Sequence, residues 1–182
     1  QPFWKNWVLA GAESDEVILN EVVVPAQLAW VADATGEMDP IQISGFLWFE
    51  LLIAAAYLGM ASALAERAIA SRRGSHGDRA LLGSELEGAM AALEGVARWM
   101  ATGQKDQDML ARMLFVRYAV EGASARASNL AAEMLGGMAF IRSAEVAYLL
   151  AACRGLAFHP PSRTSMSESL ADYLAGGALS MR

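Results

Sequence analysis

From Pro40 onward, apolar residues recur three or four positions apart, and this spacing limits the possible folds more than any other feature of the chain. Side chains at these intervals share one face of an α-helix, so each run predicts a helix with one buried face. Glycine often follows the last turn of a helix, because it adopts positive φ without steric cost. Glycine-containing steps end these runs at 72–74, 102–103, 136–137, 155 and 176–177. The sequence therefore predicts five helices.

Polar residues mark where several of these helices begin. The third is expected to run from Asp106 to Leu135, and the fourth opens after Ser143. Capping boxes, in which a hydroxyl and an acid three residues later bond reciprocally to backbone amides, are predicted for two helices. They are Ser84 with Glu87 for the second helix and Ser165 with Glu168 for the fifth. The expected fold is mainly α: an antiparallel four-helix bundle with a short terminal helix.

The first 28 residues have a different composition, rich in β-branched and aromatic side chains. Such residues favour extended backbone, and acidic or glycine-containing clusters between them indicate turns. Two or three strands are predicted here, and because an isolated hairpin is marginally stable, the rest of their sheet is expected elsewhere. The predicted organisation is therefore the last strands of a β domain over 1–28, a connector over 29–40, and a helical bundle over 41–182.

Hydrophobic residues make up 55% of the 182 residues and charged residues 19%. Typical soluble domains are roughly 45–50% apolar and about 25% charged, so this chain has more apolar surface than one small bundle needs. The expected covers are missing parts of the same protein, identical subunits or a cofactor. The net charge of −6 offers no basic field for phosphates, so no nucleic-acid partner is predicted.

Between Ile41 and Ala65 the only charged residue is Glu50, and a run of about 20 apolar residues can span a bilayer. Polar residues within the run and the absence of flanking lysines at its N-terminal side favour a buried core helix instead. No membrane partner is predicted, and no export signal is evident, so the cytoplasm is expected. The chain starts at Gln1 in strand-like sequence, which suggests a fragment or one half of a split protein.

Three segments carry a resemblance to a known family. They read GAESDEVILNEVVVPAQL at 11–28, AAAYLGMASALAERA at 54–68 and EMLGGMAF at 133–140. In this order they resemble the closing strands, the first C-terminal helix and the "LGGxGY/F" segment of acyl-CoA dehydrogenases. The resemblance covers nearly the whole chain, and it implies the C-terminal half of such a protein, with FAD as cofactor.

The resemblance also implies a dimer or tetramer in which a neighbouring subunit completes the flavin pocket. Glycine lets backbone amides approach a pyrophosphate closely, which suits Gly136 and Gly137 to that contact. Two alternatives are that Gly136 and Gly137 only end a helix and that Arg72 and Arg73 lie at a solvated helix end. The cofactor-binding residues implied in this way are Arg72, Arg73, Glu133, Gly136, Gly137, Thr164 and Ser165.

The family's usual catalytic glutamate has no counterpart in this sequence. When Thr164 and Ser165 are aligned with the family's motif, Ser162 takes the glutamate's place, and a serine without a partner base is not basic near pH 7. Some family members carry the base on the first bundle helix, where Glu50 is the best candidate. Phe49 occupies the matching position, however, and Glu50 lies one residue, or about 100°, away around the helix. The alternative is a carboxylate near water or a partner arginine.

The leading functional prediction is the C-terminal portion of an acyl-CoA dehydrogenase-like flavoprotein that oxidises an acyl thioester at Cα–Cβ, inactive without its N-terminal half. A flavin-dependent hydroxylase of the same fold is the first alternative. In that case His159 is a candidate acid or base, because histidine titrates near neutral pH; fixing a loop is its other possible role. The second alternative is a degenerate, non-catalytic subunit that supports a paired family member.

Overall fold

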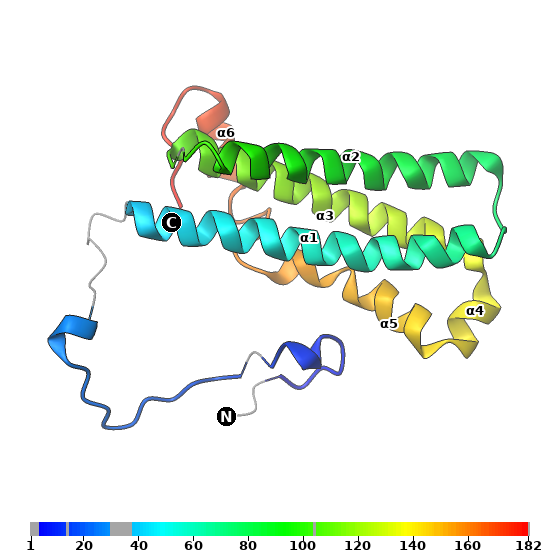
Figure 1. The fold of residues 1–182 in the computed structure, drawn as a ribbon, viewed down its shortest axis with the longest axis horizontal. Helices are drawn as coiled ribbons and strands as arrows, with labels where there is room; N and C mark the ends of the chain where they lie inside the picture. The colour runs from blue at the N-terminus through cyan, green and yellow to red at the C-terminus, as the bar shows by residue number, and fades with distance from the viewer. Residues whose placement is uncertain (1–3, 14, 30–37, 104, 182) are drawn as a thin grey trace.

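A computed structural model describes residues 4–13, 15–29, 38–103 and 105–181, and helices dominate it (Figure 1). Three helices are long, with 25 to 31 residues each. The α-helices are α1 (Pro40–Ala70), α2 (His76–Met100), α3 (Gln107–Leu135), α4 (Gly137–Arg142), α5 (Ala144–Ala152) and α6 (Ser167–Leu174). Short 3-10 helices are η1 (Ala10–Ala12), η2 (Ala26–Leu28) and η3 (Gly155–Phe158).

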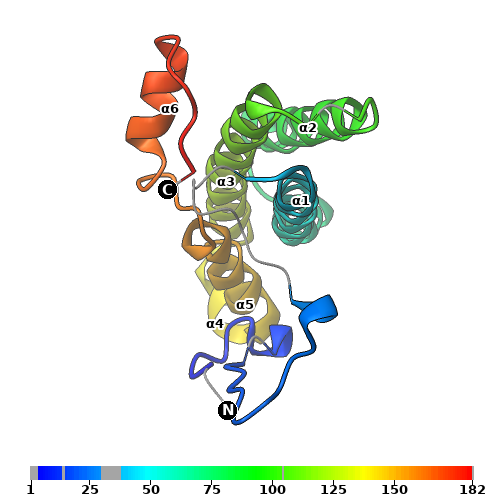
Figure 2. The same ribbon diagram turned by 90° about the vertical axis from the view of Figure 1, so that its left-hand side faces the viewer.

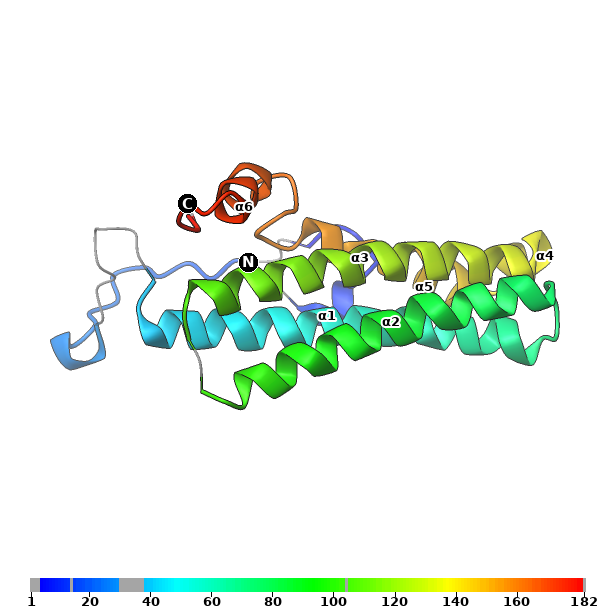
Figure 3. The same cartoon turned by 90° about the horizontal axis from the view of Figure 1, so that it is seen from above.

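The long helices follow one another up and down, so that α1 and α3 run parallel while α2 runs against both (Figures 1 and 3). Helices α4 and α5 then return along the bundle as a shorter fourth element. Seen end-on, α3 lies between α2 and α5, and it packs against α1 along its length (Figure 2). The predicted mainly helical bundle is confirmed.

The predicted apolar stripes form the interior. Leu58 on α1 and Leu114 on α3 are among the fully enclosed side chains. Two clusters of buried residues result, one around the first half of α1 and α3 and one around their second half. The terminal segment contributes to the first cluster through Met166 and Leu170, so α6 closes one end of the core.

Two predicted helix starts are wrong. Helix α2 begins at His76, where Ser75 and Asp78 form the capping box: the Ser75 amide donates to Asp78 Oδ2 at 2.7 Å, and the Asp78 amide donates to Ser75 Oγ at 3.0 Å. Ser84 lies inside the helix, because the Ser75 cap starts α2 eight residues before the predicted capping position.

The fifth predicted helix is α6, and Ser165 does not cap it. Its hydroxyl donates to the Ser162 carbonyl at 2.8 Å, inside the preceding turn. Met166 precedes the helix instead and is buried, so apolar packing rather than a hydroxyl cap positions its start. The structure also adds α4, which the sequence pattern did not predict because its six residues are too short to show a periodicity.

The predicted strands are absent from the described residues up to position 29, which form η1, η2 and extended but unpaired backbone. Val17 is 81% exposed and Val23 is 90% exposed. A strand exists only when its amides and carbonyls pair with a neighbour, and no described segment lies alongside to supply that ladder. The β-branched composition favours strands, but the described segments do not complete a sheet.

Helix α1 is long and apolar enough to cross a membrane by length and composition. In the structure it lies within the bundle, and ten of its residues are buried there. The core helix of a bundle has the same composition, because most of its faces contact other helices. Packing therefore accounts for the apolar residues on the inward face of α1, while others on its outer face stay exposed.

The packing predicts different costs for two leucines on α1. Leu58 is 1% exposed and Leu52 is 60% exposed. Leu58→Ala should lower the free energy of unfolding by about 2–5 kcal/mol, because it leaves a cavity that the bundle fills only in part. Leu52→Ala serves as the matched control and should change it by about 0.5 kcal/mol or less. Urea unfolding followed by circular dichroism measures both, and equal losses would contradict this description of the core.

Candidate functional site

Two opposite charges lie inside the bundle at the interface of α1 and α3. Arg117 Nε is 2.6 Å from Glu50 Oε2, and both side chains are fully buried. The contact is an ion pair whose N–H is not aligned for a hydrogen bond, and Glu50 Oε1 has no partner among the described residues. Taking two charges from water is costly, so such a pair requires further polar contacts.

Arg117 has those contacts in the segment that follows η3. Its NH1 group donates to the Pro161 carbonyl at 2.8 Å, and NH2 donates to the carbonyls of Leu156 at 3.0 Å and His159 at 2.6 Å. The Tyr118 hydroxyl adds a bond to the Pro161 carbonyl at 3.0 Å. The 156–161 segment is therefore held to α3 by backbone carbonyls, independently of its side-chain sequence.

His159 projects from this held segment toward α1. Its Nε2 lies 2.9 Å from the Tyr57 hydroxyl, and its ring meets the Phe49 ring edge-on with centroids 6.4 Å apart. Burial, assisted by the nearby Arg117 charge, lowers the pKa of His159 below its usual value. The imidazole is therefore neutral near pH 7 and able to accept a proton.

His159 also lines a cavity of about 650 Å³ between the N-terminal segment and the η3 region. Most of the lining is apolar, and the titratable side chains in it are His159 and Lys5. The lining residues are Trp4, Lys5, Asn6, Val8, Leu9, Ala151, Gly155, Phe158, His159 and Pro160. An apolar cavity with few polar groups suits a small molecule that has one reactive polar end.

Gly155 makes this arrangement possible. A Cβ at this position would lie 2.5 Å from the Tyr57 hydroxyl oxygen and 2.7 Å from Leu9 Cδ1. Any larger residue would push Tyr57 away from His159 or open the N-terminal side of the cavity. The sequence suggested that Gly155 ends a helix. In the structure its lack of a side chain instead lets η3 pack closely against α1.

Glu50, the predicted base, is not among the described residues that line the cavity. Removal from water raises the pKa of Glu50 to about 7, and the attraction of Arg117 opposes part of that rise. Phe49, the neighbouring position, faces the His159 ring instead. In this structure Glu50 therefore contacts Arg117, which holds the 156–161 segment, whereas His159 lines the cavity.

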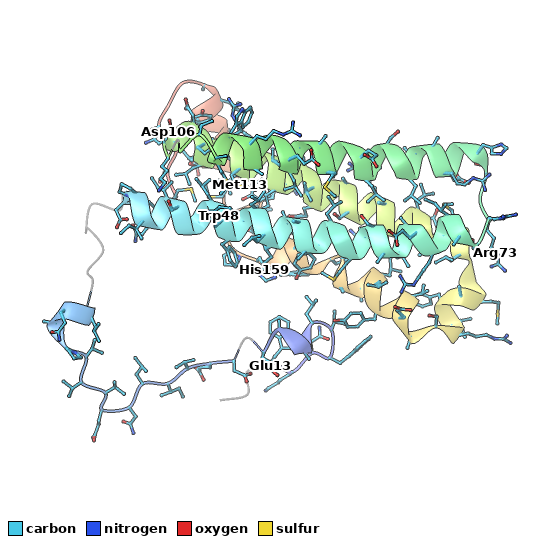
Figure 4. All side chains as sticks on the ribbon, viewed as in Figure 1. Glu13, Trp48, Arg73, Asp106, Met113 and His159 are labelled. Carbon is cyan, nitrogen blue, oxygen red and sulfur yellow. The ribbon has the colours of Figure 1, made fainter. Side chains whose placement is uncertain are left out.

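Several residues predicted to bind the cofactor gather at the far end of α1 and α3, where Figure 4 shows Arg73 well away from His159. Arg73 NH1 donates to the Leu135 carbonyl at 2.6 Å and lies beside Gly136, whose φ is +82°. A Cβ built on Gly137 has no neighbour within 4 Å. The fold around Gly137 therefore has no steric need for glycine, and open backbone next to Gly136 and Arg73 suits a diphosphate. Arg72 and Glu133 are exposed in the same region.

Ser162, Thr164 and Ser165 form a separate hydroxyl turn. Ser162 Oγ lies 3.1 Å from Thr164 Oγ1 and 3.2 Å from Ser165 Oγ. The Ser162 carbonyl lies 3.3 Å from the Tyr118 hydroxyl, whereas Arg73 contacts Leu135. At 1.5 Å per helical residue, these two anchor points are roughly 25 Å apart along α3. The structure therefore brings the predicted cofactor residues together in two groups rather than one.

Sequence reasoning missed Arg117, Tyr57, Tyr118 and Gly155. A signal for Arg117 existed, because it falls between Met113 and Val120 on the inward stripe of the third helix. A lone charge on an inward face requires an opposite partner, and Glu50 on the first helix is the matching case. Nothing in the sequence indicates that loop carbonyls complete the contact.

The raised pKa of Glu50 predicts a pH dependence of stability. Between its ordinary value of 4.5 and about 7, the folded protein keeps a proton that the unfolded chain releases. The resulting stabilisation is complete below about pH 4.5 and is lost as the pH rises through 7, at about 1.4 kcal/mol per pKa unit. The free energy of unfolding of the wild type, relative to Glu50→Gln, should therefore fall across this range.

Denaturant unfolding at several pH values measures that difference. Glu85→Gln is the control, because the Arg126 hydrogen bonds lower the pKa of Glu85 and place its pH dependence in more acidic solution. Parallel stability curves for wild type and Glu50→Gln would show that Glu50 does not titrate in this window.

Comparison with known proteins finds a relative of stated activity. Over 180 residues the chain is 48% identical to isobutylamine N-hydroxylase of Streptomyces viridifaciens. The match covers 98% of this chain and 48% of the relative, so the chain spans about half the length of that curated protein. No family model matches the chain. No solved structure matches it either.

Proposed function

We propose that this chain is the helical part of a flavin-dependent hydroxylase that acts on the nitrogen of a small aliphatic primary amine. The observation that carries the proposal is the 48% identity, over 98% of the chain, to a protein whose stated activity is N-hydroxylation of isobutylamine. This similarity supports the hydroxylase alternative more than acyl-thioester oxidation. An apolar cavity with a neutral histidine in its wall is compatible with such a substrate.

The reaction sets a demand on protons. An alkylammonium ion, dioxygen and an anionic reduced flavin give an alkylhydroxylamine, water and oxidised flavin. The nitrogen must lose a proton before its lone pair can attack oxygen, and the second oxygen atom leaves as water only if it gains a proton. A residue that accepts the proton from the nitrogen and donates a proton to the departing oxygen returns to its starting protonation state.

His159 is the residue that suits this exchange. It lines the cavity and is neutral near pH 7, and an apolar cavity lowers the pKa of an enclosed ammonium, so His159 can accept its proton there. The Tyr57 hydroxyl at 2.9 Å holds the ring and offers a hydrogen-bond partner for Nε2 in either tautomer. Trp4, Leu9 and Phe158 in the cavity wall would contact the alkyl group.

FAD would supply the two electrons that activate dioxygen when it is bound. The residues that fit its diphosphate are Arg72, Arg73, Gly136 and Gly137, and the hydroxyls of Thr164 and Ser165 suit a second part of the cofactor. Because these groups lie roughly 25 Å apart along α3 by helix geometry, we propose that one subunit supplies each group to a shared flavin in a homodimer or homotetramer.

Acyl-thioester oxidation remains a prediction, and two features speak against it. Ser162 stands at the usual place of the base and bonds to neighbouring hydroxyls. Glu50, the other carboxylate considered, is paired with Arg117. The non-catalytic subunit also remains a prediction, and a single set of assays separates the three.

The first assay uses the full-length protein with FAD, a flavin reductase, dioxygen and isobutylamine. Mass spectrometry should detect the alkylhydroxylamine, with oxygen from ¹⁸O₂ in the product. Flavin bleaching by acyl-CoA under anaerobic conditions would instead support the dehydrogenase. A protein inactive in both assays and colourless after purification would support the non-catalytic subunit.

His159→Gln should lower amine hydroxylation by about 100-fold or more, because general acid–base groups contribute about 10²–10⁴-fold. The amide still reaches the Tyr57 hydroxyl, so the fold should persist. His76→Gln is the matched control, since His76 is exposed at the start of α2. Initial rates of hydroxylamine formation measure both variants, and an active His159→Gln enzyme would remove His159 from the chemistry.

Gly137→Asp tests the flavin contact, because it places a carboxylate where the diphosphate is proposed to lie. The dissociation constant for FAD should rise about tenfold or more, since like charges at about 4 Å repel by about 1–4 kcal/mol near a protein surface. Gly88→Asp on α2 is the control, because a Cβ there also has open space. Equal FAD affinity in both variants, measured by fluorescence quenching, would contradict the proposed diphosphate contact at Gly137.

A further inference from the structure

Arg117 is bonded to the backbone on both sides of His159 and to His159 itself. Its three carbonyl partners belong to residues 156, 159 and 161, so the guanidinium spans the whole turn on which the imidazole is carried. The side chain is fully buried, and its planar group cannot rotate without losing several bonds together.

His159 is held by contacts from two helices, α1 and α3. From α1, the Tyr57 hydroxyl holds Nε2 at 2.9 Å. From α3, Arg117 holds the His159 carbonyl at 2.6 Å. Glu50 and Tyr57 are seven residues apart, or about two helical turns, so they project from the same face of α1 toward the same segment. The ring is therefore fixed by its side chain to one helix and by its main chain to the other.

We infer that Arg117, with Glu50 as its buried counter-ion, is a positioning residue that places the His159 imidazole against Tyr57 and the cavity. The inference rests on the proposed function only for the role of His159, whereas the geometry stands apart from it. Arg117 touches neither the cavity nor a substrate, and it acts through the loop. The Glu50 carboxylate neutralises the positive charge of Arg117, which would be costly to bury alone. This role requires no proton transfer by Glu50.

The test follows the imidazole directly. The chain contains two histidines, and His76 lies at the start of α2, at the other end of the bundle. Selective ¹⁵N labelling of histidine in the full-length protein gives one set of ring signals for each histidine, and the set that is missing from the His159→Gln variant belongs to His159. Titration of these signals gives the protonation and the hydrogen bonding of His159 in the folded state, without flavin or amine.

Arg117→Lys keeps the positive charge but cannot span three carbonyls. The ring signals of His159 should shift, and its pKa should rise toward the ordinary value because the ring leaves its enclosed place while the charge stays. The kcat of amine hydroxylation should fall about 100-fold, as for a displacement of about 1 Å, with a smaller change in KM. Arg126→Lys, on the same helix but paired with Glu85 at the surface, should leave both readouts unchanged.

Glu50→Gln separates positioning from direct catalysis. Its carboxamide oxygen can still lie beside Arg117, so the signals of His159 should stay in place and activity should fall less than in Arg117→Lys. The charged and titratable groups around His159 are Tyr57 from α1, Arg117 from α3 and Lys5 across the cavity, with Glu50 behind Arg117. Loss of activity in Glu50→Gln with unshifted His159 signals would make Glu50 the base and overturn the inference.

Unshifted His159 signals in a folded Arg117→Lys protein would also overturn it, since a merely structural arginine lowers stability alone. If that variant does not fold, Glu50→Gln/Arg117→Gln is measured instead, because it leaves no unpaired buried charge, and the same shift is expected. Shifted signals in a protein that hydroxylates no amine would leave the positioning intact and refute the proposed function.

Discussion

The buried pair between α1 and α3 sets the arrangement of the loop that carries His159. Burying a carboxylate and a guanidinium costs several kcal/mol per ion, and the attraction between them offsets this cost only when further hydrogen bonds are present. The loop after η3 provides them through three carbonyls. The same contacts fix a turn that has no regular secondary structure after Phe158. A charge in the interior and an ordered loop at the surface therefore depend on each other.

The chain leaves much apolar surface uncovered outside this centre. Trp48, Phe49 and Leu52 lie exposed on α1, and the extended residues before η2 contact little. Soluble proteins rarely present so much apolar area, which agrees with a chain that spans about half of its relative. The cavity beside His159 is bounded partly by the N-terminal segment, so its shape depends on how that segment is held.

Helical periodicity was sufficient to predict the bundle, because burial repeats along each long helix, and glycines marked the C-terminal ends of these helices, whereas the start of α2 was missed. It failed where the determinant was not periodic: in the short α4, in the start of α6 at a buried methionine, and in strands that need a partner. Glu50 and His159 were recognised as unusual from their local sequence. Their connection could not be predicted, because it passes through Arg117 to main-chain atoms, which carry no sequence identity.

The spacing of Glu50 and Tyr57 on α1 limits where residues can be inserted into or deleted from this protein. Glu50 and Tyr57 reach the two ends of one contact system from a single face of α1. One residue inserted between them would turn every following side chain by about 100° and separate the ion pair from the tyrosine. The turns at 71–75 and 101–103 carry no such phase relation. Insertions and deletions compatible with the site should therefore gather in the turns and spare the seven-residue interval.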